Sequence, residues 1–362
     1  MSELDSIEAA IEAIRGGRMI IVVDDDDREN EGDLIMAAAT ATPEQVAFMV
    51  RHTSGILCTP LSAADAARLR LQPMVSVNDA PLQTAFTVSV DYRYGLTTGI
   101  SAEERTSTIR ALANRNAGPE DFVRPGHIFP LIAREGGVLI RSGHTEAAID
   151  LCRLAGVESG GVLAELVNDD GTVKRLPGCL QFAREHGLPI ISIADLIEYR
   201  QRREQLVRRV ASFEVQTLSG PATAIVYATP FDPIQHVAVV FGDLAGGERV
   251  PARIHREQPL VDLLGGGSAG IARALARIGR DGRGVFVLLR DTVVGQPSVD
   301  GALEEHESAQ RRMRQWREVG LGAQILRDLG IVSIHLLAAH RRHYIGLSGF
   351  GIELADTEIL EG

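Results

Sequence analysis

Residues 20–39 read IIVVDDDDRENEGDLIMAAA and place a dense acidic segment between two apolar runs. The first run is short and β-branched, which predicts a buried strand that ends at Asp24. Seven carboxylates lie among the ten residues from Asp24 to Asp33, and like charges repel one another unless water, a cation or Arg28 compensates them. The segment is therefore either a solvated acidic loop or a site for a divalent metal.

The sequence on either side of this stretch alternates between helix and strand patterns. Apolar residues recur at helical spacing from Ile7 to Ile14, and Thr42 with Pro43 opens a helix that continues to His52. Further strands are expected at 55–58, 85–90, 137–140, 162–167 and 189–193, and further helices from 101, from 145 to 154 and from 194 to about 210. This mixture predicts an α/β fold (mixed α+β).

The chain is long enough for two domains, because its 362 residues exceed the usual size of one. The helix expected from residue 194 becomes strongly charged after Tyr199, which is typical of a solvent-exposed connector. We therefore expect a boundary near residue 205, with one domain over 1–205 and a second mixed α/β domain over 206–362.

The charge distribution argues against nucleic acid as a partner. Residues 1–200 contain 29 acidic and 18 basic side chains and residues 201–362 contain 19 of each, so the net charge of −11 belongs to the first part. Nucleic-acid affinity depends on clustered Lys and Arg side chains. Lys174 is the only lysine and lies in a turn-like stretch, which argues against a P-loop and a Schiff-base enzyme. Arginine must therefore bind any phosphate.

Cysteine usage and hydropathy argue against two further classes. Cys58, Cys152 and Cys179 form no CxxC pair and no cysteine follows, so a structural zinc site is not expected. The apolar runs are far shorter than the roughly 18 residues that a membrane span needs. The sequence predicts a soluble, cytoplasmic protein that does not enter a membrane.

A second polar cluster, RSGHTEAAID at residues 141–150, follows the apolar segment 137–140. Helix N-termini bind anions through their free backbone N–H groups. With Thr145 as the N-cap, Arg141 and Thr145 would hold a phosphate while His144 faces a metal. The alternative is an ordinary capped helix with a surface histidine.

Two isolated residues are candidate acids or bases. His127 lies in RPGHIFPL, residues 124–131, between prolines that restrict the backbone. It is either a rigidly placed acid or base or a structural histidine in a loop. Glu165 is flanked by apolar residues on an expected strand, so its carboxylate is either paired or suited to proton transfer.

Five motifs together resemble the 3,4-dihydroxy-2-butanone 4-phosphate synthase family, in the family's order over roughly residues 5–200. They are RENEGD at 28–33, TTGISAEERTSTIRA at 97–111, RPGHIFPL at 124–131, RSGHTEAAIDL at 141–151 and ELVNDDG at 165–171. The resemblance implies an α/β sandwich. It also implies conversion of D-ribulose 5-phosphate to L-3,4-dihydroxy-2-butanone 4-phosphate and formate in riboflavin biosynthesis.

The resemblance further assigns roles to the matching residues. It implies that Glu29 and His144 bind Mg²⁺, with Mn²⁺ as a substitute, and that neither zinc nor an organic cofactor is used. The implied catalytic positions are His127 and Glu165, with Glu31 and Cys58 as nearby candidates. The implied substrate-binding positions are Arg28, Glu29, Asp33, Arg141, Ser142, Gly143, His144, Thr145 and Glu165. The family's site lies at a homodimer interface, so a homodimer is expected.

Residues from about 207 onward resemble GTP cyclohydrolase II, the usual fusion partner, in VAVVFGDLAGGERVPARIHRE (237–257) and GRGVFVLL (282–289). The three zinc-binding cysteines of that family are absent, because QPLVDLLGGGSAG follows residue 257. RDTVVGQPS at 290–298 replaces the family's arginine segment. We expect no GTP cyclohydrolase activity. The domain is retained either for packing, dimer contacts or regulation, or as a repurposed nucleotide pocket.

Three functions are compatible with the whole chain. A lyase is favoured over a bifunctional enzyme because the cysteines are missing. It is also favoured over a binding module that keeps only the fold, because each motif-matched acid, base and ligand is present.

Overall fold

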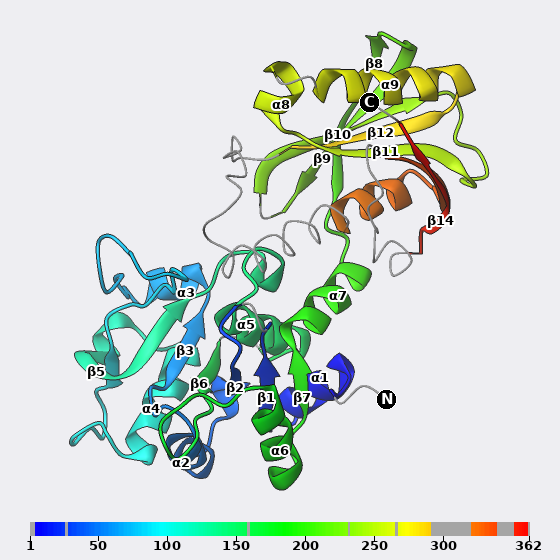
Figure 1. Ribbon diagram of the computed structural model, residues 1–362. Helices are drawn as coiled ribbons and strands as arrows, with labels where there is room; N and C mark the ends of the chain where they lie inside the picture. Colours follow the sequence, from blue (N-terminus) through cyan, green and yellow to red (C-terminus); the bar gives the residue numbers. More distant parts are fainter. Residues whose placement is uncertain are drawn as a thin grey trace. The chain divides into compact units, whose positions relative to one another are not determined.

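The computed structural model describes residues 4–25, 28–157, 160–230, 232–264, 267–290, 320–338 and 351–360. The chain forms two compact units, Met1–Tyr199 and Arg200–Gly362. Each unit contains a seven-stranded sheet with helices, so the expected mixed α/β class is confirmed (Figure 1). None of the helices in the described ranges combines the length and apolarity of a membrane span.

The first sheet contains both parallel and antiparallel neighbours, in the order β4-β5-β3-β6-β2-β1-β7. Its strands are β1 Ile20–Val23, β2 Gly32–Ala37, β3 Cys58–Leu61, β4 Val90–Tyr92, β5 Phe122–Ile132, β6 Gly161–Glu165 and β7 Ile190–Ser192. The apolar runs that flank the acidic segment are β1 and β2. They pair antiparallel from Ile20 opposite Ile35 to Val23 opposite Gly32. The acidic segment is therefore the connection of a β-hairpin.

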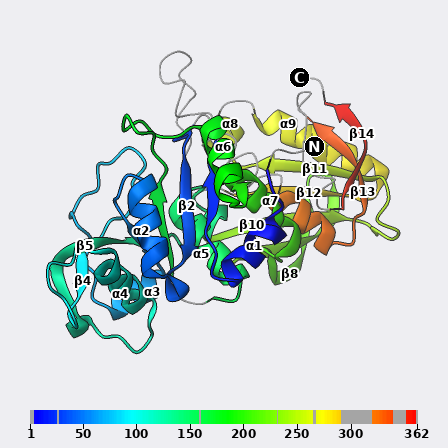
Figure 2. The ribbon, with the colours of Figure 1, turned by 90° about the horizontal axis from the view of Figure 1, so that it is seen from below.

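Helices cover both faces of this sheet. On one face, α1 (Ile7–Arg15) and α5 (His144–Leu154) pack together and contact β2. On the other, α2 (Pro43–His52), α4 (Ala102–Ala113) and α6 (Leu176–His186) contribute to one apolar core, and α2 packs against α4 (Figure 2). Every residue of β1 and β2 is buried, as expected of strands covered on both faces.

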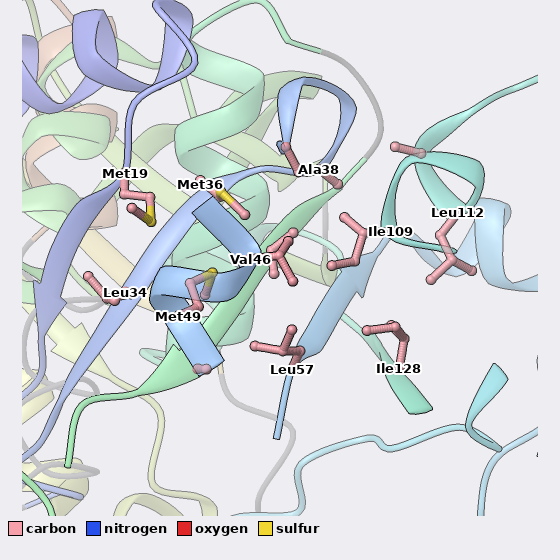
Figure 3. Close-up of a cluster of buried hydrophobic side chains, with 14 of the residues drawn as sticks. Met19, Leu34, Met36, Ala38, Val46, Met49, Leu57, Ile109, Leu112 and Ile128 are labelled. Carbon is pink, nitrogen blue, oxygen red and sulfur yellow. The ribbon is translucent and has the colours of Figure 1, made fainter. Parts of the chain in front are cut away.

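The core explains why the expected helices form where they do. Figure 3 shows Val46 of α2 between Met36 of β2 and Ile109 of α4, and all three side chains are fully buried or nearly so. Thr42 and Ser101 each begin a helix with a capping box, in which side chains satisfy N–H groups of the first turn. Local capping and tertiary burial therefore agree on these two helices.

Residues 137–140 do not form the expected strand. They form a 3-10 turn, Gly137–Leu139, because Gly136 and Gly137 adopt φ angles of 92° and 64°. The N–H of Val138 then donates at 2.8 Å to the buried carboxylate of Asp150 on α5. An apolar run of this length predicts burial correctly but does not distinguish a strand from a tight turn.

Pairing within the sheet gives several other elements bounds that differ from the expected ones. The strands expected at 55–58 and 85–90 begin only at Cys58 and Val90, and the segment 124–131, taken as a loop, lies within β5. Short connecting helices are α3 (Ala63–Arg68) and two 3-10 turns at 38–40 and 119–121. The charged helix expected to about 210 is α7, Ile193–Arg203, because residues from Arg208 onward pair with a neighbouring strand.

The second unit has its own sheet, in the order β14-β13-β11-β12-β10-β9-β8. Its strands are β8 Arg208–Thr217, β9 Gly220–Thr229, β10 Asp232–Phe241, β11 Val250–Arg256, β12 Gly284–Leu289, β13 Ser333–Ala338 and β14 Glu353–Ile359. Its helices are α8 (Pro259–Leu264), α9 (Gly267–Asp281) and a helix over 320–328. The glycines at 265 and 266 and the RDTVVGQPS segment beyond residue 290 lie outside the described residues.

Candidate active site

Strand register aligns several of the predicted site residues across the first sheet. Asp33 on β2 lies directly opposite Glu165 on β6 and directly opposite Val22 on β1. Opposed residues on antiparallel strands share a face, so the two carboxylates lie on one face of the sheet. Cys58 on β3 pairs with Leu163, which lies on the same strand as Glu165. The start of β2, where the acidic connection ends, therefore lies beside the end of β6.

Asp24 organises the acidic connection between β1 and β2. Its Oδ2 accepts hydrogen bonds from the Arg28 guanidinium at 2.8 Å and the Glu29 backbone N–H at 3.0 Å, and its Oδ1 accepts one from the Glu31 N–H at 2.9 Å. Arg28 also donates to Glu29 Oε2 at 2.6 Å, and Arg175 donates to the Glu29 carbonyl at 2.6 Å. The connection is therefore held by its own hydrogen bonds and is not merely a solvated acidic loop.

His144 brings the second predicted ligand to this connection. It is the first residue of α5, and its buried ring places Nδ1 at 3.4 Å from Glu29 Oε2 and 3.9 Å from Asp33 Oδ1. Its Nε2 lies 3.1 Å from the Val22 carbonyl oxygen, which accepts a hydrogen bond from it. The carbonyl therefore fixes the ring and leaves Nδ1 to face the carboxylates. The alternative of a surface histidine is wrong.

Two overlapping groups of side chains offer ligand atoms for a cation. Asp24, Glu29 and His144 form one group, and Glu31, Asp33 and His144 form the other, with the ligand atoms of each group within 4.8 Å of one another. Asp33 Oδ1 is buried and accepts no hydrogen bond within the described ranges. Ligands of Mg²⁺ at about 2.1 Å in octahedral geometry lie about 3 Å apart, so this donor set fits the ion.

Burial and mutual repulsion shift the pKa values of Glu31 and Asp33 upward. Burial, assisted by repulsion from Glu29, raises the pKa of Glu31 to about 7. Burial also raises the pKa of Asp33 well above its usual value, and Glu165, Glu31 and Glu29 repel its charge further. Both carboxylates therefore resist ionisation in the absence of a cation.

The pKa values of the two predicted ligands move apart. Burial opposes the charge on Glu29, but the hydrogen bond with His144 and the charge of Arg28 outweigh it and lower the Glu29 pKa to about 2. Burial likewise opposes the imidazolium of His144, yet Asp33 and Glu29 raise its pKa to about 9. A positive charge on His144 thus balances the carboxylates, and a divalent cation would take over that role.

Arg141 lies just before α5 and is clamped from two sides. Its Nη1 donates to Glu146 Oε2 at 2.6 Å, and its Nη2 donates to the Leu82 carbonyl and the Thr84 hydroxyl, both at 3.1 Å. Glu146 is buried, so its carboxylate requires this positive charge. The guanidinium is therefore held in a fixed orientation beside the start of the helix.

The start of α5 differs from the expectation in its cap. Gly143, not Thr145, is the N-cap, and no side chain caps the helix. A Cβ at Gly143 would lie 2.3 Å from Arg141 Nη1, so only glycine allows the guanidinium to pack there. The first N–H groups of the helix, next to Ser142 and Thr145, have no side-chain cap and are suited to an anion.

His127 lies on β5 and is oriented by a carboxylate that no sequence motif marks. Its Nδ1 lies 2.7 Å from Asp91 Oδ2, and its backbone N–H donates to Asp91 Oδ1 at 2.8 Å. Asp91 is buried on β4, whereas the His127 side chain is 40% exposed. The pair fixes the proton on Nδ1 and leaves Nε2 as a potential base. β3 separates His127 from Glu165 on β6.

Glu165 is paired with a serine, and Cys58 lies nearby as a neutral thiol. Ser54 donates its hydroxyl to Glu165 Oε2 at 2.5 Å and its N–H to the Glu165 carbonyl at 2.8 Å. Burial raises the pKa of the Cys58 thiol well above its usual value, and the charges of Glu165 and Asp33 raise it further. Cys58 is therefore a neutral thiol and not a thiolate nucleophile.

Sequence reasoning missed the residues that hold the predicted ones in place. Asp24 was one of a run of four aspartates, and no pattern marked it as the one that accepts three hydrogen bonds. Three further residues each form a hydrogen bond with a predicted one. Asp91 holds His127, Glu146 holds Arg141 and Ser54 holds Glu165. Glu146 alone carried a signal, since it lies in the same motif as Arg141.

Comparison with known proteins assigns a family to each unit. Residues 8–199 match 3,4-dihydroxy-2-butanone 4-phosphate synthase, and residues 208–358 match GTP cyclohydrolase II. The chain belongs to the 3,4-dihydroxy-2-butanone 4-phosphate synthase family. Among its relatives, the monofunctional riboflavin biosynthesis protein RIBA 2, chloroplastic, of Arabidopsis thaliana is 47% identical over 97% of this chain and 76% of that protein. Riboflavin biosynthesis protein RibBA of Salinispora arenicola is 46% identical over 98% of this chain and 88% of that protein.

Solved structures in this synthase family agree. RibBX, a two-domain 3,4-dihydroxy-2-butanone 4-phosphate synthase from A. baumannii, superposes with a TM-score of 0.80 at 38% identity and covers 99% of each chain. A second synthase, solved in complex with two magnesium ions, gives a TM-score of 0.54 at 44% identity over 55% of this chain and 98% of that one. The family expected from the five motifs is confirmed.

We expect Glu29→Gln and His144→Gln each to weaken Mg²⁺ binding by roughly 10–100-fold or more, because each removes one ligand. Isothermal titration of the full chain with Mg²⁺ measures the dissociation constant. Glu44→Gln is the matched control, since Glu44 lies in the first turn of α2, outside both ligand groups. Unchanged affinity in both ligand variants would show that the site is elsewhere.

Proposed function

We propose that this chain converts D-ribulose 5-phosphate to L-3,4-dihydroxy-2-butanone 4-phosphate and formate. One observation carries the proposal: the Glu29 carboxylate and the His144 imidazole, far apart in sequence, lie 3.4 Å apart. Membership of the synthase family supports it, as does the riboflavin biosynthesis role in the relatives' names. The enzyme is then a lyase that cleaves a carbon–carbon bond.

The reaction needs repeated proton transfers and stabilised negative charge on the sugar oxygens. Glu29 and His144 would hold Mg²⁺, with Mn²⁺ as a substitute, and the ion supplies the positive charge next to those oxygens. Glu31, which lies beside Asp33 and His144 in the second ligand group, is one proton carrier in this proposal. Glu165, oriented by Ser54, is a second proton carrier. The proposal requires no zinc and no organic cofactor.

Arginine binds the substrate's phosphate in this proposal. The fixed guanidinium of Arg141 and the uncapped first turn of α5, with Ser142, Gly143 and Thr145, present positive charge and N–H groups together. Arg28, which is paired with Asp24, and Asp33, which lies 3.9 Å from His144 Nδ1, would contact the sugar.

We infer that a homodimer completes the site. Among the described residues of the first unit, the large hydrophobics that remain exposed all fall between residues 56 and 100: Ile56, Met74, Val75, Val77, Tyr94 and Ile100. Such a concentration of exposed apolar side chains is typical of an interface. His127 lies on β5, and the neighbouring strand β4 falls within this stretch of sequence. The His127 side chain is exposed, so in the proposed homodimer its Nε2 would reach the acidic segment of the second copy.

The remaining partner and location proposals follow from charge and composition. The excess of 29 acidic over 18 basic side chains in residues 1–200 disfavours nucleic acid. The substrate is then the small-molecule partner, and the cytoplasm is the proposed location.

The direct test is release of formate from D-ribulose 5-phosphate by the full chain with Mg²⁺. We expect turnover that EDTA abolishes and that added Mg²⁺ or Mn²⁺ restores, because the ion stabilises the developing charge. Formate dehydrogenase coupling measures the rate. Substrate binding without formate in any metal condition would instead indicate a sugar-phosphate binding module.

Glu165→Gln tests the role of the proton carrier. We expect kcat to fall by about 10²–10⁴-fold while KM changes little, because glutamine keeps the hydrogen bond with Ser54 but cannot transfer a proton. Steady-state kinetics with D-ribulose 5-phosphate separates the two constants. Ser54→Ala is the control for orientation alone and should have a milder effect on kcat. An unchanged kcat in Glu165→Gln excludes this role.

We further propose that the second unit does not hydrolyse GTP. The relatives' names do not decide this, since RIBA 2 is called monofunctional and RIBA 1 of Arabidopsis thaliana, 45% identical, is called bifunctional. The positions of the cysteines argue against GTP hydrolysis. The chain's three cysteines, Cys58, Cys152 and Cys179, all precede residue 208. Without thiolates, the zinc ion that would activate water has no soft ligands in this unit.

We expect the purified chain to contain no stoichiometric zinc and to release no formate from GTP above background. Atomic absorption measures the metal, and the same formate assay measures turnover. The riboflavin-pathway activity of the same preparation serves as the positive control. Zinc at one equivalent together with GTP turnover would overturn this part of the proposal.

A further inference from the structure

The second sheet ends in a long strand with one free edge. β8 is the last strand in the order and, within the described ranges, pairs only with β9. It spans ten residues, and all seven residues from 208 to 214 are exposed. Natural edge strands are usually short or interrupted by Lys, Pro or inward charges, because an open edge pairs with other chains. β8 contains neither Lys nor Pro, and its one register shift against β9, between Arg209 and Ala211, leaves the stretch 211–217 regular.

The pairing of β8 with β9 shows which backbone groups face outward. Gln216 lies opposite Pro221, which has no N–H, so these two residues form a pair without mutual hydrogen bonds. Such pairs alternate with hydrogen-bonded ones along an antiparallel ladder. The N–H and C=O groups of Ser212, Glu214 and Gln216 therefore point away from β9 and toward the open edge.

An apolar stripe runs along one face of the same strand. Ala211, Phe213 and Val215 alternate with polar residues, and Val215 packs against the core cluster that contains Ala274 of α9. Phe213 lies on the same face of β8 as Val215 but is 54% exposed. It therefore continues the apolar stripe beyond the part that the core covers. A strand placed beside β8 would cover it.

We propose that β8 pairs antiparallel with β8 of a second copy of this chain, about a two-fold axis at Phe213. This register sets Ser212 opposite the partner's Glu214 and Ala211 opposite the partner's Val215. A hydroxyl group then lies opposite a carboxylate, and two apolar side chains lie opposite each other. Centring the axis on Glu214 would instead oppose two carboxylates, which is destabilising. Two second-unit sheets then become one continuous sheet, and no residue of the proposed catalytic site takes part.

The register makes a disulfide test possible. The chain's three cysteines are all buried, so they do not compete with an introduced thiol. Residues opposed in a pair without mutual hydrogen bonds have Cα atoms about 4.5 Å apart, within disulfide range. We expect Phe213→Cys in the full chain to form a disulfide-linked dimer under mild oxidation, read on a non-reducing gel.

Leu218→Cys is the matched control. Leu218 lies in the turn after β8 and is 93% exposed. In the proposed register the two copies of Leu218 lie at opposite ends of the strand pair, roughly 34 Å apart, so no cross-link is expected. Absence of a cross-link at 213, or equal cross-linking at both positions, overturns the proposal.

Light scattering gives a second, independent measurement. Ser212→Pro removes an outward N–H and is tolerated on an edge strand, whereas Ser212→Ala keeps that N–H. We expect the assembly mass of Ser212→Pro to be half that of Ser212→Ala. If the first unit dimerises as well, β8 in this proposal joins two such dimers into a tetramer, and Ser212→Pro halves the mass by returning it to dimers. Equal masses for the two variants would contradict the pairing.

Discussion

The first unit is built around a concentration of like charge that its own hydrogen bonds and one buried histidine must neutralise. Carboxylates repel one another most strongly where water is excluded, and Asp33 and His144 are both buried. The neutralising groups are Arg28 on the acidic connection and His144 at the start of α5, while Arg175 before α6 holds the connection through a backbone carbonyl. Each comes from a different element, so the charge cluster exists only when these elements are assembled.

That assembly depends on register. A shift of one residue between β2 and β6 would move Glu165 to the face opposite Asp33 and separate the two carboxylates. The fully buried β1 and β2 hold the register, because a slip would expose apolar side chains of the core. The energy that fixes the site is therefore largely the burial of apolar residues that take no part in the chemistry.

The second unit keeps its fold without containing any cysteine. Its sheet, its α9 core and the ladder from β10 to β12 remain regular, although no cysteine is available as a metal ligand. Fold and function are separable in this way, because packing needs apolar volume whereas catalysis needs particular side chains. Within the described residues the outer edge of β8 is unpaired, and this is a property of the strand order and not of any metal ligand.

The sequence by itself determined the class of the fold and predicted the residues of the candidate site. Glu29 and His144 could be named because short motifs carry their chemistry locally, and α2 and α4 could be predicted because caps and helical spacing are local properties. Residues 137–140 and 124–131 were misassigned, because apolar runs and prolines do not reveal which strand a segment will pair with. The tertiary structure alone decided that Asp91 orients His127, that Ser54 holds Glu165 and that Asp24 ties the acidic connection together. Such contacts join groups across strands, and their partners are set by register and packing, which no local pattern of residues encodes.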